Sequence, residues 1–216
     1  MRISAVIFDL NGTVLDDEEL YAKAFGGVLK SLGVEPPSGI FQQKGIGVKE
    51  NWEIFLKRYP INTDKNSSML TEETQNAYLK TISEISVRAG FSEFVERLKE
   101  SGILIGLATS NTWEITDRVL TAADLQGVFD VISTREEILY SKPDPDIFTL
   151  TADKLGCERE NCLVIEDSAS GVEAARRAGM KVVGIAVGEN DSDLLKNADA
   201  VVEGFSEITP QLIDQL

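Results

Sequence analysis

Polar residues that could do chemistry follow three apolar runs of the sequence. Asp9 follows the first run, Thr109 the second and the pair Glu166-Asp167 the third, while Lys142 stands just before Pro143. The chain contains no histidine, which excludes Ser-His-Asp and Cys-His catalysis as well as metal sites built on histidine. Any chemistry must therefore come from carboxylates, lysine, hydroxyls, backbone amides or a hard metal ion.

The apolar runs predict strands of a sheet that is buried on both faces, because they show no alternation with polar residues. The predicted strands are 3–8, 103–108, 131–132, 163–165, 182–187 and 200–202. Segments with helical spacing separate most of them, which indicates a doubly wound parallel sheet of the α/β, Rossmann-like class. Parallel strands release their chains at one edge of the sheet, where such folds bind ligands. We therefore expect the polar residues to meet there.

Residues 16–88 contain helical patterns and no convincing strand. The acidic cluster Asp16–Glu19 is interpreted as the cap and first turn of a helix, where the helix dipole favours negative charge. Trp52 lies on an apolar helical face, which is typical of core, and a further helix is predicted from about residue 71 to 87. We expect a core made of residues 1–15 and 89–216, and a small all-helical cap at 16–88 inserted after the first strand.

Four short motifs occur in a fixed order along the chain. They are Asp9-x-Asn11-Gly12-Thr13, Thr109-Ser110-Asn111, Lys142-Pro143, and Glu166-Asp167-Ser168 with Gly171. In this order they resemble the motifs of the haloacid-dehalogenase-like (HAD) phosphohydrolases, and the resemblance covers essentially the whole chain. The position of the predicted cap resembles the branch that contains β-phosphoglucomutase, phosphoglycolate phosphatase and phosphonatase.

The resemblance implies phosphoryl transfer to a carboxylate. Asp9 would be the nucleophile that forms an aspartyl-phosphate, Lys142 would supply positive charge, and Thr109 would contact the phosphoryl oxygens, with Ser110 and Asn111 as further substrate contacts. Because a phosphomonoester dianion repels a carboxylate, the implied cofactor is Mg²⁺. Its implied ligands are Asp9, the Asn11 backbone carbonyl, Asp167, and Glu166 either directly or through a water.

Asn11 departs from the family pattern, which has a second aspartate at this position. That aspartate protonates the leaving group and later activates water, whereas a carboxamide cannot exchange the proton. General acid–base catalysis is typically worth about 10²–10⁴-fold. The alternatives left open are a slow or specialised enzyme, a phosphate-binding relative without turnover, and an engineered replacement of aspartate.

Candidate substrate contacts from the cap are Tyr21, Gly47 and Lys49. Tyr21 stands where mutase-like relatives often have a histidine, which disfavours a mutase. A phosphonatase would need a cap lysine, and Lys23, Lys44 and Lys49 are the candidates. The predicted function is hydrolysis of a small phosphomonoester, such as a sugar phosphate, with a phosphomutase or phosphonatase as the alternative enzyme.

The composition narrows the choice of partners. The 216-residue chain carries a formal net charge of −15, so we expect neither nucleic acid nor an anionic membrane surface as a partner. No apolar run reaches membrane-spanning length, so we expect no membrane span, and we expect no signal peptide. The two cysteines, Cys157 and Cys162, are interpreted as reduced thiols, which is typical of a cytoplasmic protein. We predict a monomer that acts on a small phosphorylated metabolite.

Overall fold

The computed structural model describes residues 3–188 and 191–216. Its centre is a six-stranded, all-parallel sheet in the order β3-β2-β1-β4-β5-β6, which confirms the predicted α/β class. The strands are β1 (Ala5–Phe8), β2 (Leu104–Ala108), β3 (Val131–Ser133), β4 (Cys162–Glu166), β5 (Lys181–Ile185) and β6 (Ala200–Val202). The first strand lies between β2 and β4, so its end stands beside the ends of both.

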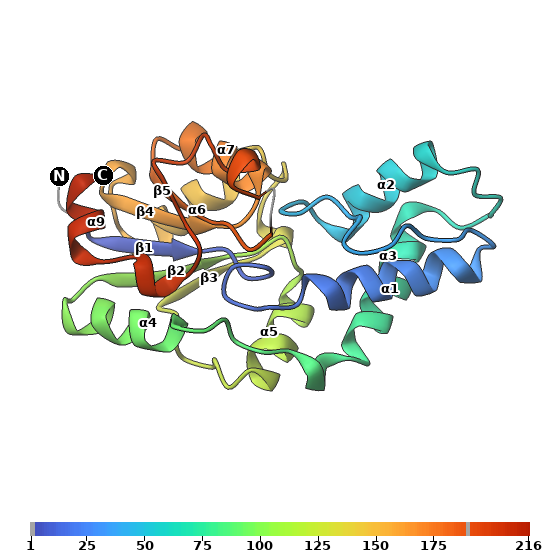
Figure 1. Cartoon of the computed structure of the whole chain (residues 1–216), viewed down its shortest axis with the longest axis horizontal. Helices are drawn as coiled ribbons and strands as arrows, with labels where there is room; N and C mark the ends of the chain where they lie inside the picture. The colour runs from blue at the N-terminus through green and yellow to red at the C-terminus, as the bar shows by residue number, and fades with distance from the viewer. Residues whose placement is uncertain (1–2, 189–190) are drawn as a thin grey trace.

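The two faces of the sheet are covered by separate apolar cores. Alternate residues of a strand point to opposite faces, so Val6 and Phe8 belong to one core while Ala5 and Ile7 belong to the other. Figure 1 shows α4 and α5 on one side of the sheet and α6 and α7 on the other. Burial on both faces explains why the strands read as continuous apolar runs.

The helices around the sheet are α4 (Phe91–Glu100), α5 (Trp113–Ala122), α6 (Asp146–Leu155), α7 (Ala169–Arg177), α8 (Asp191–Leu194) and α9 (Pro210–Gln215). Short 3₁₀ turns are η1 (Ile82–Glu84), η2 (Arg135–Glu137), η3 (Arg159–Asn161) and η4 (Phe205–Glu207). None of the helices in the described ranges combines the length and apolarity needed to span a bilayer. Both cysteines are free thiols.

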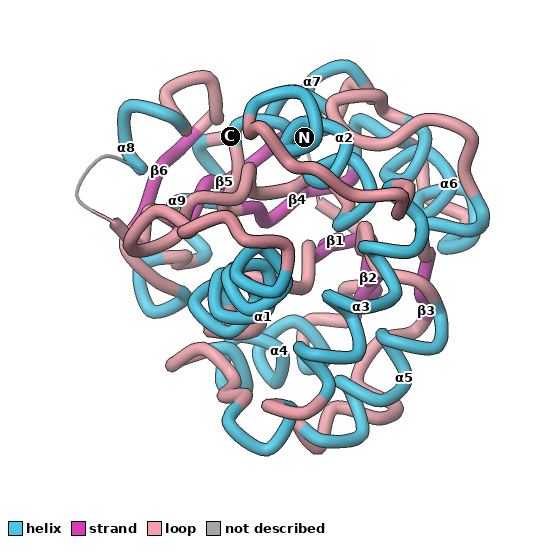
Figure 2. Tube along the Cα trace, turned by 90° about the vertical axis from the view of Figure 1, so that its right-hand side faces the viewer, coloured by secondary structure: helices cyan, strands magenta, loops and turns pink. Residues whose placement is uncertain are grey.

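Three helices stand together beyond the carboxyl ends of the strands: α1 (Glu18–Ser31), α2 (Val48–Arg58) and α3 (Ser67–Leu79). Figure 2, viewed from their side, shows them in front of the strand ends. Phe25, Trp52 and Phe55 form their aromatic core, and the Trp52 indole donates to Thr74 at 2.8 Å. Trp52 is fully buried, as predicted, and these aromatic side chains belong to the same apolar cluster as Val6 and Phe8 of β1.

The third helix differs from its predicted range. It begins at Ser67 because the Asn66 side chain accepts a hydrogen bond from the Met69 amide at 3.0 Å and caps the helix there. It ends at Leu79, and Val87 instead pairs in antiparallel fashion with Leu15. The prediction of a helix from 71 to 87 was therefore wrong at both ends.

Candidate active site

Asp9, Lys142 and Glu166 form a buried ion cluster at the carboxyl edge of the sheet. Asp9 follows β1 directly, Glu166 is the last residue of β4, and Lys142 comes from the loop before α6. The Lys142 ammonium lies 2.5 Å from Asp9 Oδ1 and 2.7 Å from Glu166 Oε1. Burial lowers the pKa of Lys142, but Asp9 and Glu166 outweigh this effect and raise it above its ordinary value. The lysine is therefore a fixed cation beside the Asp9 carboxyl.

Glu166 is oriented so that its Oε1 pairs with Lys142. Its second oxygen, Oε2, accepts from the backbone amide and the hydroxyl of Ser168, each at 2.8 Å. A Cβ atom at Gly171, in the first turn of α7, would overlap the Glu166 carboxylate. The glycine of the fourth motif thus makes room for the acid, and both Glu166 oxygens are engaged.

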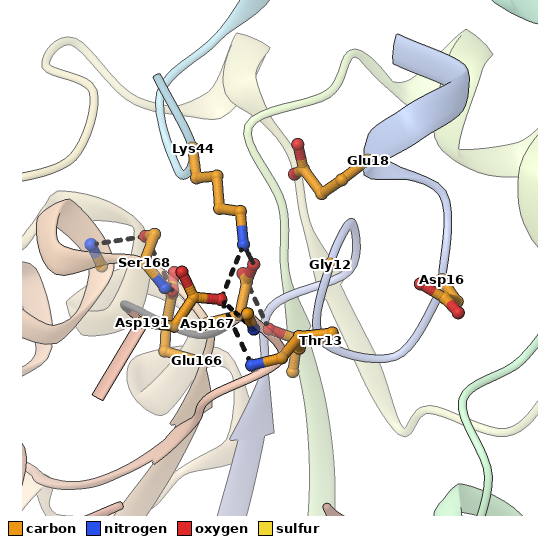
Figure 3. A network of polar contacts seen from close by, with 12 residues as sticks. Gly12, Thr13, Asp16, Glu18, Lys44, Glu166, Asp167, Ser168 and Asp191 are labelled. Carbon is orange, nitrogen blue, oxygen red and sulfur yellow. Dashed lines mark hydrogen bonds and ion pairs between the residues drawn. The ribbon is translucent and has the colours of Figure 1, made fainter. Parts of the chain in front are cut away.

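Asp167 faces the centre of the site from the neighbouring position. Its Oδ1 accepts from the Thr13 hydroxyl at 3.2 Å, and Lys44 approaches Oδ2 to 3.5 Å. Figure 3 shows Lys44 extending toward this carboxylate from the segment before α2. Gly12 has φ +80°, and a Cβ there would overlap Asp167, so this turn requires glycine.

The donor set at the edge fits Mg²⁺. Burial raises the pKa of Asp9 and of Asp167 well above the usual range, and neighbouring carboxylates add to the shift. Asp167 Oδ2 is buried and has no hydrogen-bond partner among the described residues. A hard cation would offset the repulsion and use that oxygen, and Mg²⁺ typically takes one or two carboxylates and keeps several waters. No three Asp, Glu, His or Cys side chains in residues 3–188 and 191–216 form a ready-made metal cluster, so carbonyl and water ligands would have to complete the shell.

Asn11 is fixed by its neighbours on both sides. Its Oδ1 accepts from Asn111 at 2.7 Å, and its Nδ2 donates to Asp17 at 2.6 Å. Asp17 Oδ2 also accepts from the Tyr78 hydroxyl at 2.5 Å, and Oδ1 accepts from the Gly12 amide at 3.2 Å. Asp17 occupies the N-cap position of α1, but its side chain makes no cap hydrogen bond. The interpretation of this acid as a helix cap was therefore wrong: the turn at Gly12 directs it back to Asn11.

The predicted substrate residues are brought together, with two exceptions. A cavity of about 50 Å³ is lined by several of them, namely Asp9, Asn11, Tyr21, Gly47, Ser110 and Asn111. Thr109 does not line the cavity; its hydroxyl accepts from the backbone amide of Asn111, which does, at 3.1 Å. Lys49 is exposed in the first turn of α2 and does not line the cavity, because Val48 and Asn51 face it instead. The structure therefore does not place Lys49 in the site.

Comparison with known proteins identifies the family. The model of the haloacid dehalogenase-like hydrolases matches residues 6–185. The chain belongs to this family. Hexitol phosphatase B of Escherichia coli (strain K12) is 29% identical over 211 residues, covering 96% of this chain and 95% of that protein.

Two further proteins are similar over nearly their whole length. A phosphorylated carbohydrates phosphatase of Thermotoga maritima is 31% identical over 203 residues, covering 92% of this chain and 93% of that protein. The crystal structure of β-phosphoglucomutase from Clostridium difficile has a TM-score of 0.84 at 26% identity, covering 99% of this chain and 96% of that one. The predicted resemblance and the predicted enzyme class are confirmed.

Sequence reasoning missed two residues that reach the site of this HAD-like hydrolase. Glu18 and Lys44 both line the cavity beside Asp9, whereas the sequence predicts Glu18 only as part of a helix start and Lys44 only as one of three alternative lysines. The sequence contains a signal for neither position, because both depend on how α1, α2 and the segment between them lie on the strand ends.

Proposed function

We propose that this HAD-like hydrolase is a Mg²⁺-dependent phosphatase that hydrolyses a small phosphomonoester of the sugar-phosphate class. The observation that carries the proposal is the buried Asp9–Lys142–Glu166 cluster with Asp167 beside it. The names of the hexitol phosphatase and the carbohydrate phosphatase support the substrate class.

Asp9 is the nucleophile in this proposal. An Asp9 oxygen attacks phosphorus, the bond from phosphorus to the leaving oxygen breaks, and the resulting aspartyl-phosphate is later hydrolysed by water. Lys142 holds the Asp9 carboxyl in place and offers positive charge to the phosphoryl group. Ser110 lines the cavity next to Asp9 and would contact the phosphoryl oxygens. The Thr109 hydroxyl helps to hold Asn111, another cavity residue, by accepting a hydrogen bond from its backbone amide.

Asp9, Asp167 and the Asn11 backbone carbonyl would hold the Mg²⁺ ion. Mg²⁺ bound there would neutralise part of the negative charge that separates a phosphate dianion from a carboxylate. Glu166 acts on Lys142 instead, because both of its oxygens are already engaged.

The test is hydrolysis of p-nitrophenyl phosphate in the presence of Mg²⁺. We expect the Asp9→Asn variant to lose activity to the background level, because a carboxamide is a poor nucleophile. Asp16→Asn is the matched control, since Asp16 is an exposed acid whose contact is a 3.6 Å ion pair with Arg88. Full activity of Asp9→Asn would overturn the proposal.

The same variants separate the alternatives that the sequence left open. With a hexose phosphate, phosphorus NMR distinguishes release of inorganic phosphate from formation of an isomeric phosphate ester. We expect inorganic phosphate, whereas an isomeric ester would favour a mutase, to which the similarity with β-phosphoglucomutase also points. Binding of phosphate without turnover by the unaltered chain would favour the binding relative.

A further inference from the structure

Glu18, the first residue of α1, directs its carboxyl group into the active-site cavity. It lines the same cavity as Asp9 and Asn11. The Gln42 side-chain amide donates to Glu18 Oε2 at 2.8 Å and to the Glu18 backbone carbonyl at 3.0 Å. Figure 3 shows the Glu18 carboxylate on the side of the helix start that faces Lys44, whereas Asp16 lies on the far side. The position of the Glu18 carboxyl group is thus fixed by Gln42, which lies 24 residues further along the chain.

Neither Asn11 nor its partner Asp17 is suited to give a proton to a substrate in this cavity. Asn11 has no exchangeable acid proton, and its carboxamide is bonded at both ends to Asn111 and Asp17. Asp17 is saturated by three donors and does not line the cavity. Among the described residues that line this cavity, the carboxylic acids are Asp9 and Glu18. With Asp9 as nucleophile, Glu18 is the acid that is left.

The surroundings of Glu18 suit proton exchange near neutral pH. Burial raises the pKa of Glu18 to about 7, and the negative charges of Asp17 and Asp9 act in the same direction. Lys44 and the Gln42 hydrogen bond oppose the shift. An acid–base catalyst works best when its pKa lies near the working pH, because both of its forms are then available.

We propose that Glu18 is the general acid and base that the chain lacks at position 11, a proposal that rests on the phosphatase function proposed above. As Asp9 attacks phosphorus, the bond from phosphorus to the leaving oxygen breaks, and the protonated Glu18 gives its proton to that oxygen. The dephosphorylated product departs as a neutral alcohol. The Glu18 carboxylate then accepts a proton from the water that attacks the aspartyl-phosphate. Asp9 is released as a carboxylate, inorganic phosphate leaves, and Glu18 is again protonated.

The test compares Glu18→Gln with Glu19→Gln on two aryl phosphates that differ in how much their leaving group needs a proton. Glu19 is the matched control, because it is the next residue of the same helix and is exposed. Glutamine at position 18 keeps an oxygen that can accept from Gln42. For phenyl phosphate, with its basic leaving group, we expect Glu18→Gln to lower kcat/KM by about 10²–10⁴-fold. For p-nitrophenyl phosphate we expect a loss of roughly tenfold or less.

A pH profile gives a second readout that a merely structural role would not change. With phenyl phosphate, kcat/KM of the unaltered chain and of Glu19→Gln should fall above about pH 7, and this limb should be absent in Glu18→Gln. Equal losses on both substrates, or a retained limb, would overturn the assignment of Glu18. If Asp9→Asn keeps its activity in the same assay, the proposed function fails, whatever Glu18 does.

Discussion

At the scale of single residues, the carboxamide of Asn11 lies against the buried carboxyl group of Asp17. The two side chains form a polar pair, because Asn11 Nδ2 donates to Asp17 Oδ2 at 2.6 Å. Burial raises the pKa of Asp17, and the hydrogen bonds from Tyr78 and Asn11 oppose that shift. Asn11 is therefore part of the arrangement that keeps a buried carboxyl satisfied.

This pairing makes a specific prediction for Asn11→Asp. The substitution would bring two carboxyl oxygens to the separation now spanned by a hydrogen bond, so one carboxyl would have to stay protonated. We expect the free energy of unfolding at about pH 8 to fall by roughly 1–3 kcal/mol, measured by urea denaturation.

The matched variant adds Asp17→Asn to Asn11→Asp, which reverses the direction of the hydrogen bond. The double variant should recover most of the lost stability, and the double-mutant cycle should show a coupling free energy of about 1 kcal/mol or more. A stable Asn11→Asp single variant with no coupling to position 17 would contradict this account and favour Asn11 as a simple replacement of aspartate.

The sequence predicts the site residues at the strand ends better than those contributed by the segment between α1 and α2 and by α2. Asp9, Thr109 and Asp167 could be placed because a polar residue at the end of a buried parallel strand has a definite location. Lys44 and Lys49 could not be distinguished, because the choice depends on where α2 begins and on which of its faces meets the core. The structure places Lys44 at Asp167 and leaves Lys49 exposed.

At the scale of elements, the turn from β4 into α7 positions the Lys142–Glu166 pair. The Ser168 hydroxyl accepts from the Gly171 amide at 3.0 Å and caps α7, while it also donates to Glu166. The predicted strands agree with the observed ones because burial on both faces leaves a continuous apolar signal. The predicted start of α3 does not, since Asn66 and Thr71 are both plausible caps by residue type and only the structure shows that Asn66 caps the helix.

Gly171→Ala tests whether this glycine makes room for Glu166. Alanine normally favours a helix over glycine by about 1 kcal/mol, but its methyl group at this position would overlap the Glu166 carboxylate. We expect a loss of stability of roughly 1–3 kcal/mol and reduced phosphatase activity. Gly27→Ala is the matched control, because Gly27 lies within α1 with open space around its Cβ position. It should gain about 0.5–1 kcal/mol; a gain at both positions would show that Glu166 can move without cost.

At the scale of the whole molecule, several carboxyl groups lie close together at the junction between α1–α3 and the strand ends. Asp9 and Asp167 approach it from the sheet, and Asp17 and Glu18 from the start of α1; the pKa of each is raised, with burial as the largest cause. Lys44 extends from the segment between α1 and α2 to form ion pairs with Asp167 and Asp191 at 3.5 and 3.2 Å. The net charge of −15 adds no attraction for a phosphate dianion, so local cations must supply it.

These raised pKa values determine how stability changes with pH when no metal is bound. A group whose pKa is higher in the folded state contributes stability that is complete below its unfolded pKa and is lost as the pH rises through its folded pKa. For Glu18 this window runs from the ordinary 4.5 to about 7, and the loss amounts to roughly 1–3 kcal/mol. We therefore expect the Tm measured in the presence of a chelator to fall as the pH is raised from about 5.5 to about 8.

Two comparisons separate this effect from the general repulsion of an acidic chain. Glu18→Gln should lose part of the pH dependence, whereas Glu19→Gln should keep it, although both remove one formal charge. Excess Mg²⁺ should raise the Tm more at about pH 8 than at about pH 5.5, because the ion binds deprotonated carboxylates. Asp167→Asn should abolish most of that Mg²⁺ effect, and Asp16→Asn should leave it unchanged. A Tm that rises steadily up to pH 8 without metal would contradict this account, because the folded chain would then bind no more protons at this junction than the unfolded chain does.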